Sequence, residues 1–123
     1  MRGMVFVKAT MSSEQGILPT PELLAAMGKY NDELTEAGIM IDGGGLKPTS
    51  QAKRIVFDES DRTIVGGPFS ETREIVSGYW IWQVKDMDEA IVWARRCPNP
   101  MPTPSELEIR PFYDMEDFEY TAG

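Results

Sequence analysis

The sequence predicts an α+β domain in which two amphipathic helices cover one face of an antiparallel sheet. Segments rich in β-branched and aromatic residues alternate with two stretches of helical periodicity, in the order β-α-β-β-β-α-β with one short extra strand in the middle. This is the order of the split βαβ, ferredoxin-like arrangement. The chain of 123 residues is long enough for one hydrophobic core and contains no internal repeat, so we expect one domain over residues 1–113 and an acidic tail over residues 114–123.

The first half of the chain predicts two strands around a helix. Residues 4–9 are apolar and β-branched enough for a strand. Thr20 suits an N-cap and Pro21 the first helical position, which predicts a helix that ends near Gly38. Its apolar stripe is Leu23, Met27, Tyr30 and Leu34. A strand over residues 38–41 then runs into the glycines of residues 42–45, which predict a bulged strand end.

The second half predicts the remaining strands and the second helix. Residues 53–58 form a strand, residues 59–62 a turn, and residues 63–65 the short extra strand. The strongest strand covers residues 77–84. Asp86 and Glu89 then form a predicted capping box, followed by the apolar stripe Met87, Ala90, Ile91 and Ala94. Four prolines make residues 98–104 a loop, and residues 106–113 form the last strand. The acidic tail is expected to be either a mobile end or an arm on a partner.

Two of the predicted strands are apolar on both sides. Tyr79 and Ile81 oppose the tryptophans of the same strand, and Met4 and Phe6 oppose the valines between them. Such strands are covered on both faces in folded proteins, and two helices can cover only one face of a sheet of this size. Because a large exposed apolar face favours association, we expect a homodimer that packs sheet against sheet.

Composition excludes several classes of function. A net charge of −8 argues against tracking of nucleic-acid phosphates or an anionic membrane. No histidine is present, which removes the commonest general base and most zinc sites, so we expect neither a metal nor an organic cofactor. The first apolar run is too short for a signal peptide, and no run is long enough to span a bilayer. The single cysteine, Cys97, suits a reducing cytoplasm and reads as a buried small hydrophobe.

Three stretches are candidates for function, and each has a purely structural alternative. Residues 65–74 (VGGPFSETRE) combine turn-forming residues with Glu71, Arg73 and Glu74, which could be a plain turn or a charged cleft. The aromatic strand places Trp80 and Trp82 either in the core and dimer interface or in a pocket wall. Residues 42–47 (DGGGLK) hold Asp42 and Lys47 as candidate ligand contacts, although the stretch lacks both the Walker spacing and the GxGxxG pattern.

Residues 66–74 (GGPFSETRE) resemble the signature of the YCII-related, or DGPF-domain, family. The resemblance extends over nearly the whole chain, because several separated segments occur in the family's order. These segments are MVFVKAT (4–10), LLAAMGKYNDELTEAGIMIDGGGLKP (23–48), SGYWIWQVKDMDEAIVWARRCP (77–98) and LEIRPFY (107–113). The resemblance implies a ferredoxin-like protomer that dimerises into an α+β barrel, in agreement with the two-sided strands.

The resemblance implies less about activity. Most members of the family are uncharacterised, and a few resemble small lyases of aromatic compounds in which a His-Asp pair is proposed to act. This chain departs from that pattern at two points: Gly66 stands where the signature has an aspartate, and no histidine exists to form the pair.

We therefore weigh three functions. The first is a cofactor-independent lyase, isomerase or cyclase acting on a small hydrophobic or aromatic metabolite, with Glu71 or Glu74 as acid or base. In this enzyme an anionic substrate group would bind Arg73 or Arg110, and Tyr79 could donate a proton. The second is a binding protein that captures a ligand in the same pocket without chemistry. The third is a dimerisation module in which Glu71, Arg73 and Glu74 form ion pairs around a turn.

Overall fold

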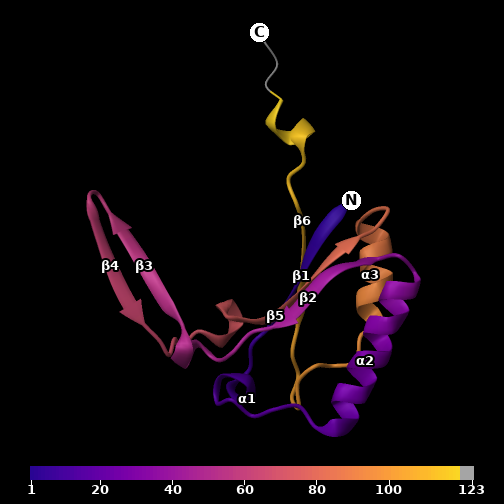
Figure 1. Cartoon of the computed structure of the whole chain (residues 1–123), viewed down its shortest axis with the longest axis horizontal. Coiled ribbons are helices and arrows are strands. Elements are labelled where there is room, and N and C mark those ends of the chain that lie inside the picture. The colour runs from indigo at the N-terminus through magenta and orange to yellow at the C-terminus, as the bar shows by residue number, and fades with distance from the viewer. Residues whose placement is uncertain (120–123) are drawn as a thin grey trace.

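The central feature of the computed structural model, which describes residues 1–119, is a four-stranded antiparallel sheet with the order β2-β5-β1-β6 (Figure 1). Its strands are β1 (Arg2–Lys8), β2 (Met40–Gly45), β5 (Val76–Gln83) and β6 (Leu107–Pro111). The first strand of the chain lies between β5 and β6, and both of its neighbours run antiparallel to it. This α+β architecture confirms the predicted ferredoxin-like fold class.

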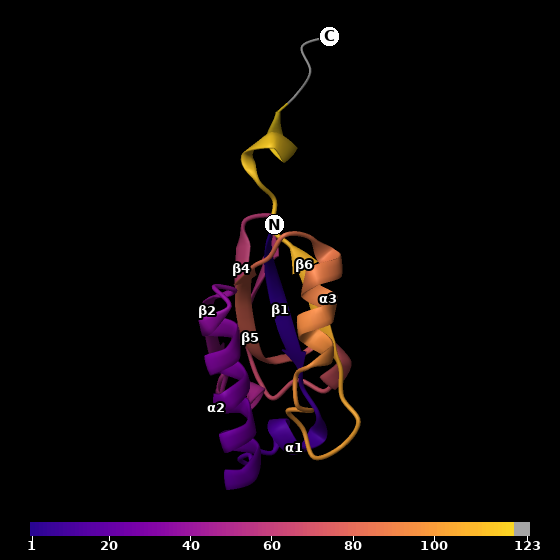
Figure 2. The same cartoon turned by 90° about the vertical axis from the view of Figure 1, so that its right-hand side faces the viewer.

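Two long helices lie side by side on one face of this sheet (Figure 2). These are α2 (Pro21–Glu36) and α3 (Met87–Arg95). The Thr20 hydroxyl accepts a hydrogen bond from the Leu23 amide and caps α2, as the sequence predicts. Asp86 caps α3 by accepting from the Glu89 amide, but Glu89 reaches back to the Lys85 amide instead of the Asp86 amide. One hydrogen bond of the predicted capping box is therefore present, and in the other the donor is the amide of the residue before the N-cap.

The hydrophobic core lies between the helices and the sheet. Its buried members come from both helices, from the inner side of β1 and β5, and from the residues just before β2 and just after β5. They are Val5, Val7, Tyr30, Leu34, Ile39, Trp80, Trp82, Val84 and Ala90. The Tyr30 ring meets the Trp80 ring edge to face, and the Tyr30 hydroxyl donates to the Trp93 carbonyl oxygen at 2.6 Å. Each large side chain in such a core contributes about 1.5–3 kcal/mol through burial. The core thus fixes the helices on one face only.

The opposite side of the sheet carries an apolar patch that we call the open face, formed by Met4, Phe6, Tyr79 and Ile81. These residues pair across β1 and β5, with Phe6 opposite Tyr79 and Met4 opposite Ile81. All four side chains are half-buried, and both long helices lie on the other face (Figure 1). The alternation predicted from the sequence is confirmed.

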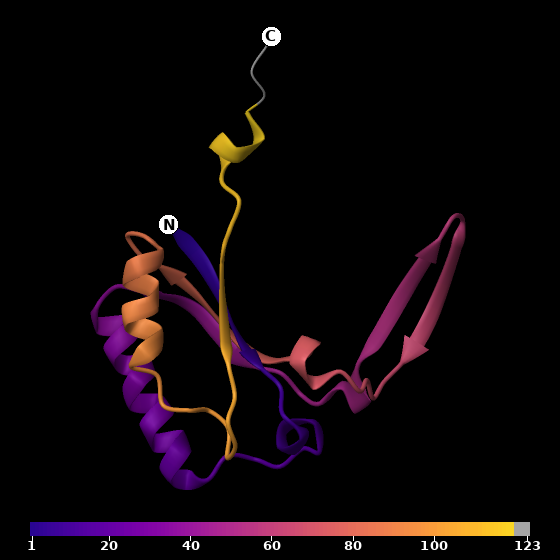
Figure 3. The same cartoon turned by 180° about the vertical axis from the view of Figure 1, so that it is seen from behind.

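A separate β-hairpin, which we call the arm (residues 53–66), projects away from the sheet (Figure 3). It consists of β3 (Lys53–Asp58) and β4 (Asp61–Gly66), which form their own two-stranded sheet. The sequence predicts strands at these positions but places the turn over residues 59–62, whereas β4 already begins at Asp61. All residues of both strands are exposed.

The remaining elements are short. The sequence did not predict the four-residue helix α1 (Met11–Glu14), because one helical turn has no periodicity to read. The 3₁₀ turns within residues 1–119 are η1 (Thr49–Gln51), η2 (Thr72–Glu74) and η3 (Met115–Phe118). Residues 98–104 form an irregular loop, as predicted. The part of the predicted tail beyond residue 119 lies outside the described residues.

Within residues 1–119, every helix falls short of the length and hydropathy that crossing a bilayer requires.

Candidate functional site

The signature turn packs tightly against the segment that enters the arm. The Gly67 amide donates to the Ala52 carbonyl oxygen at 3.1 Å, and the Gly67–Pro68 peptide is cis. A Cβ atom on Gly67 would lie 1.8 Å from the Thr49 carbonyl oxygen, so no other residue fits without moving backbone. Glycine is required here because two backbone segments approach each other.

Thr49 joins three segments at the base of the arm. Its amide donates to Glu14 Oε1 at 3.1 Å, and its hydroxyl donates to the other carboxylate oxygen of Glu14. The same hydroxyl oxygen accepts a hydrogen bond from the Phe69 amide at 3.0 Å. The half-buried Glu14 carboxylate therefore holds the 3₁₀ turn η1, and η1 holds the signature turn.

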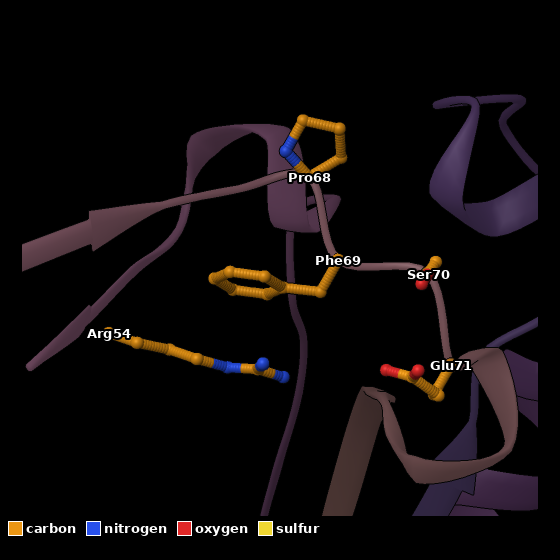
Figure 4. A pocket seen from close by; sticks show the side chains of 5 residues that line it. All are labelled: Arg54, Pro68, Phe69, Ser70 and Glu71. Carbon is orange, nitrogen blue, oxygen red and sulfur yellow. The ribbon is translucent and has the colours of Figure 1, made fainter. Parts of the chain in front are cut away.

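Two adjoining cavities, both wide open to solvent, lie where the arm meets this turn. The smaller, of about 280 Å³, is lined by Arg54, Pro68, Phe69, Ser70 and Glu71 (Figure 4). The larger, of about 540 Å³, shares Arg54 and Phe69 with it. Its other lining residues are Leu46, Lys47, Pro48, Thr49, Gln51, Ala52, Lys53, Glu74, Ile75 and Val76. We call the two cavities together the arm-base pocket.

Charged groups of both signs converge on an aromatic ring in this pocket. The Arg54 guanidinium carbon lies 3.6 Å from the centroid of the Phe69 ring, a cation–π contact. The Glu71 carboxylate points into the same space as the guanidinium (Figure 4). Lys47, Lys53 and Glu74 line the larger cavity. An apolar wall with a few convergent charged groups is the usual composition of a small-molecule site.

Three of the predicted site residues lie in the arm-base pocket. Glu71 lines the smaller cavity, and Glu74 and Lys47 line the larger one. Arg73, the fourth charged candidate of this region, is 88% exposed and points away to Glu106 at 3.7 Å. Because this ion pair is solvent-exposed, it contributes little to the stability of the fold. The predicted ion pairs between Arg73 and the two glutamates are wrong: among residues 1–119 its partner is Glu106.

The two tryptophans predicted as pocket walls lie elsewhere. Trp80 and Trp82 are 5% and 1% exposed and belong to the core beneath the helices. The Trp80 indole N–H donates to Asn31 Oδ1 at 2.9 Å. The pocket-wall interpretation is wrong for both residues within the protomer, because strand alternation turns them to the helix side. Their structural alternative, core packing, describes them.

The other predicted contacts gather on the open side of the sheet. The Tyr79 hydroxyl donates to Oδ2 of Asp42, a residue of β2, at 3.4 Å. Arg110 lies in β6 opposite Met4, two strands away from Tyr79. These three residues do not line the arm-base pocket. The predicted set therefore divides into two groups, one at the arm and one on the open face.

The glycine-rich stretch of β2 has a packing explanation. Gly43 lies opposite Trp80, and a Cβ on Gly43 would come within 2.9 Å of the Trp80 ring. The pairing of β2 with β5 shifts register between Met40 and Asp42, so the predicted bulge lies near the start of the strand. Glycine is present here because an indole ring covers the strand.

Sequence reasoning missed four residues of the arm-base site. Lys53 and Arg54 fall in a predicted strand and are not named as site residues, and Glu14 and Thr49 fall outside the predicted helices and strands. The available signal was the pattern of β3, in which two cations precede an apolar run beside the signature turn. Only the fold places that pattern next to Phe69.

Two further observations concern groups outside the pocket. Burial raises the pKa of the Cys97 thiol to about 11, which makes Cys97 a neutral, half-buried hydrophobe packed on the core. Among the residues that the structure describes, no cluster of three or more metal-ligating side chains occurs.

Known proteins are similar to this chain over most of its length. Residues 1–115 match the family model described as the YCII-related domain. An uncharacterised protein of Rhizobium meliloti (strain 1021) is 30% identical over 105 residues, which cover 85% of this chain and 82% of that protein.

Proposed function

The chain belongs to the YCII-related domain family, and from this premise we propose that it binds a small metabolite with an aromatic or apolar body and an anionic group. The ligand would lie in the arm-base pocket. The observation that carries the proposal is the Phe69 ring, which has the Arg54 guanidinium on its face and lines both cavities. An arginine can hold a carboxylate through two parallel hydrogen bonds while its plane stacks on a ring.

The charges of the pocket support an anionic ligand. The chain as a whole carries −8, yet Lys47, Lys53 and Arg54 converge on one cavity. Among the described residues none of these three cations takes part in a salt bridge, so their charges are available to a ligand. The apolar lining, which includes Leu46 and Ile75, would hold the body of the ligand.

The test is a thermal-shift and calorimetric screen of small aromatic carboxylates, with benzoate and phenylpyruvate as first probes. A ligand that prefers the native state must raise the melting temperature. At a ligand concentration of about 100 times Kd, the free energy of unfolding increases by about 2.7 kcal/mol. We expect Arg54→Gln to abolish the shift and Arg95→Gln, on the exposed side of α3, to retain it. The proposal is contradicted if the Arg54→Gln protein shows the same melting-temperature shift as wild type. It is also contradicted if no aromatic acid shifts the melting temperature of the wild-type protein.

A second candidate function is acid–base catalysis in the same pocket. The Glu71 carboxylate points towards the space that a ligand on Arg54 would occupy, which favours it as a base (Figure 4). Deuterium incorporation into phenylpyruvate in D2O, followed by NMR, tests this role. Wild type should exceed the buffer rate, and Glu71→Gln and Glu74→Gln should bind the probe but lose the excess. Equal rates in wild type and both variants would leave ligand binding as the function.

We further propose that the protein is a cytoplasmic homodimer. The open face supports the dimer, because Met4, Phe6, Tyr79 and Ile81 form an apolar surface on the side away from the helices. A single half-buried thiol is consistent with a reducing compartment. Light scattering coupled to size exclusion should give the dimer mass at micromolar concentration, and a clean monomer would contradict the dimer.

A further inference from the structure

The arm presents an apolar face that its own protomer leaves exposed. In the register of the hairpin Ile55 lies opposite Ile64 and Phe57 opposite Arg62, so these four residues share one face. Phe57, Ile64 and Ile55 are 70%, 68% and 48% exposed. The Arg62 guanidinium lies 4.6 Å from the Phe57 ring centroid and extends this surface. Three large apolar side chains thus stand in water on one side of a projecting hairpin.

Such a hairpin is not stable by itself. A lone two-stranded hairpin is at best marginal in water, and it needs a third strand or an apolar surface beneath it. The arm's contacts are chiefly between its own two strands, and it extends beyond the body of the protomer (Figures 1 and 3). The arm is long and regularly paired, and residues 1–119 of its own protomer provide no surface for it to pack on. We therefore expect it to pack on a surface outside the protomer.

The open face lies on the same side of the molecule as the arm. In Figure 1 the helices occupy one side of the sheet, and the arm stands off from the other side. Two apolar surfaces of one chain, the arm face and the open face, consequently border the same space. A second copy that occupies this space presents the same two surfaces. The arm of each copy can then contact the open face of the other, as a closed twofold interface requires.

Charge complementarity points to the same occupant. The arm tip carries three carboxylates, Asp58, Glu59 and Asp61, none of which forms a salt bridge within residues 1–119. The open side of the sheet carries Arg110 and Arg2, which also lack a salt bridge among the described residues. These two cations can pair with the arm-tip carboxylates of another copy, on a side of the sheet that also carries Asp42 and Glu108.

We propose that the arm docks its Ile55–Phe57–Ile64 face on a second copy of this chain. This inference rests on the proposed dimer and adds the segment by which each copy holds the other. It also links assembly to the arm-base pocket, because Lys53 and Arg54 are the first two residues of β3 in the arm. Docking of the arm restrains the strand that carries these two cations, and so stabilises the pocket that a single protomer already forms.

The test measures dimer dissociation of the full chain by analytical ultracentrifugation. The variant Phe57→Ser/Ile64→Ser removes the docking face, and Val56→Ser/Val65→Ser removes two exposed apolar residues from the other face of the same hairpin. Both double variants lower the strand propensity of the hairpin to a similar extent. The difference between their dimer dissociation constants therefore reports the docking of the Ile55–Phe57–Ile64 face. We expect the first pair to raise the dissociation constant at least about tenfold and the second to change it less than about threefold.

Hydrogen exchange on the wild-type protein provides a second measurement that needs no variant. Amide protection over residues 53–66 should rise when the protein concentration passes through the dimer dissociation constant. Protection that is independent of concentration, or a dimer that Phe57→Ser/Ile64→Ser leaves intact, overturns the arm proposal while the dimer itself stands. A wild-type monomer at all concentrations refutes the dimer, and the arm proposal with it.

Discussion

The substitution Gly67→Ala tests whether the signature turn holds the base of the arm. A Cβ at this position would lie 1.8 Å from the Thr49 carbonyl oxygen, and ordinary contact begins near 3.4 Å. The two backbone segments must therefore separate by about 1.5 Å, since neither partner is a flexible side chain. That separation breaks the Gly67–Ala52 hydrogen bond of 3.1 Å and the Phe69–Thr49 hydrogen bond of 3.0 Å.

The expected loss follows from these two hydrogen bonds. Each contributes about 1 kcal/mol, and residual backbone strain adds about 1 kcal/mol, so we expect about 2–3 kcal/mol in total. For a domain of this size the melting temperature should fall by about 8–12 °C.

The matched control is Gly45→Ala, because no atom lies within 4 Å of a Cβ at that position. Its melting temperature should stay the same or rise slightly, since alanine has less unfolded-state entropy to lose than glycine. Calorimetry gives the melting temperatures, and hydrogen exchange of the Phe69 amide reports the local bond. A Gly67→Ala protein that melts within about 2 °C of wild type would refute the close-approach reasoning.

Three further variants or reactions test the anchoring and the core. Thr49→Val removes the hydroxyl that bonds the Phe69 amide and Glu14 Oε2, while the residue-49 amide still donates to Glu14 Oε1; it should cost about 1–3 kcal/mol in urea unfolding, whereas Thr49→Ser should be near wild type. Leu34→Ala creates a cavity in the fully buried core and should cost about 2–5 kcal/mol by the same measurement. Alkylation of Cys97 by iodoacetamide should be slow at pH 8 and accelerate up to about pH 11, because burial raises its pKa to about 11; a plateau near pH 9 would contradict this. The raised pKa also favours the folded state below pH 9, and this contribution is lost as the pH rises towards 11.

The sequence predicts the body of the fold because its signals are local. Thr20 and Asp86 mark the starts of the two long helices, and the apolar stripes behind them give their length. Alternation in β1 and β5 predicts two chemically different faces. Alternation cannot say which face the helices cover, and for that reason it leaves Trp80 and Trp82 open between the core and a pocket wall, whereas the structure buries both.

The arm-base site depends on contacts between distant segments and is much less predictable. The Glu14–Thr49–Phe69 hydrogen bonds join residues that are 35 and 20 positions apart. The pattern of residues 53–66 predicts strands but does not state that they leave the main sheet. Lys53 and Arg54 are therefore visible in the sequence only as charged strand residues, and the contact of Arg54 with the Phe69 ring is not.

Gly66, where this chain departs from the family signature, has a direct effect on the charge of the pocket. It pairs with Lys53 across the arm, and a Cβ on Gly66 would lie 3.1 Å from the Lys53 ammonium nitrogen. An aspartate at this position would place its carboxylate beside that ammonium group and neutralise it. Glycine instead leaves the Lys53 charge to whatever occupies the larger cavity. We therefore expect Gly66→Asp to weaken the binding of aromatic carboxylates without loss of stability, since the ion pair replaces a free charge at an exposed site.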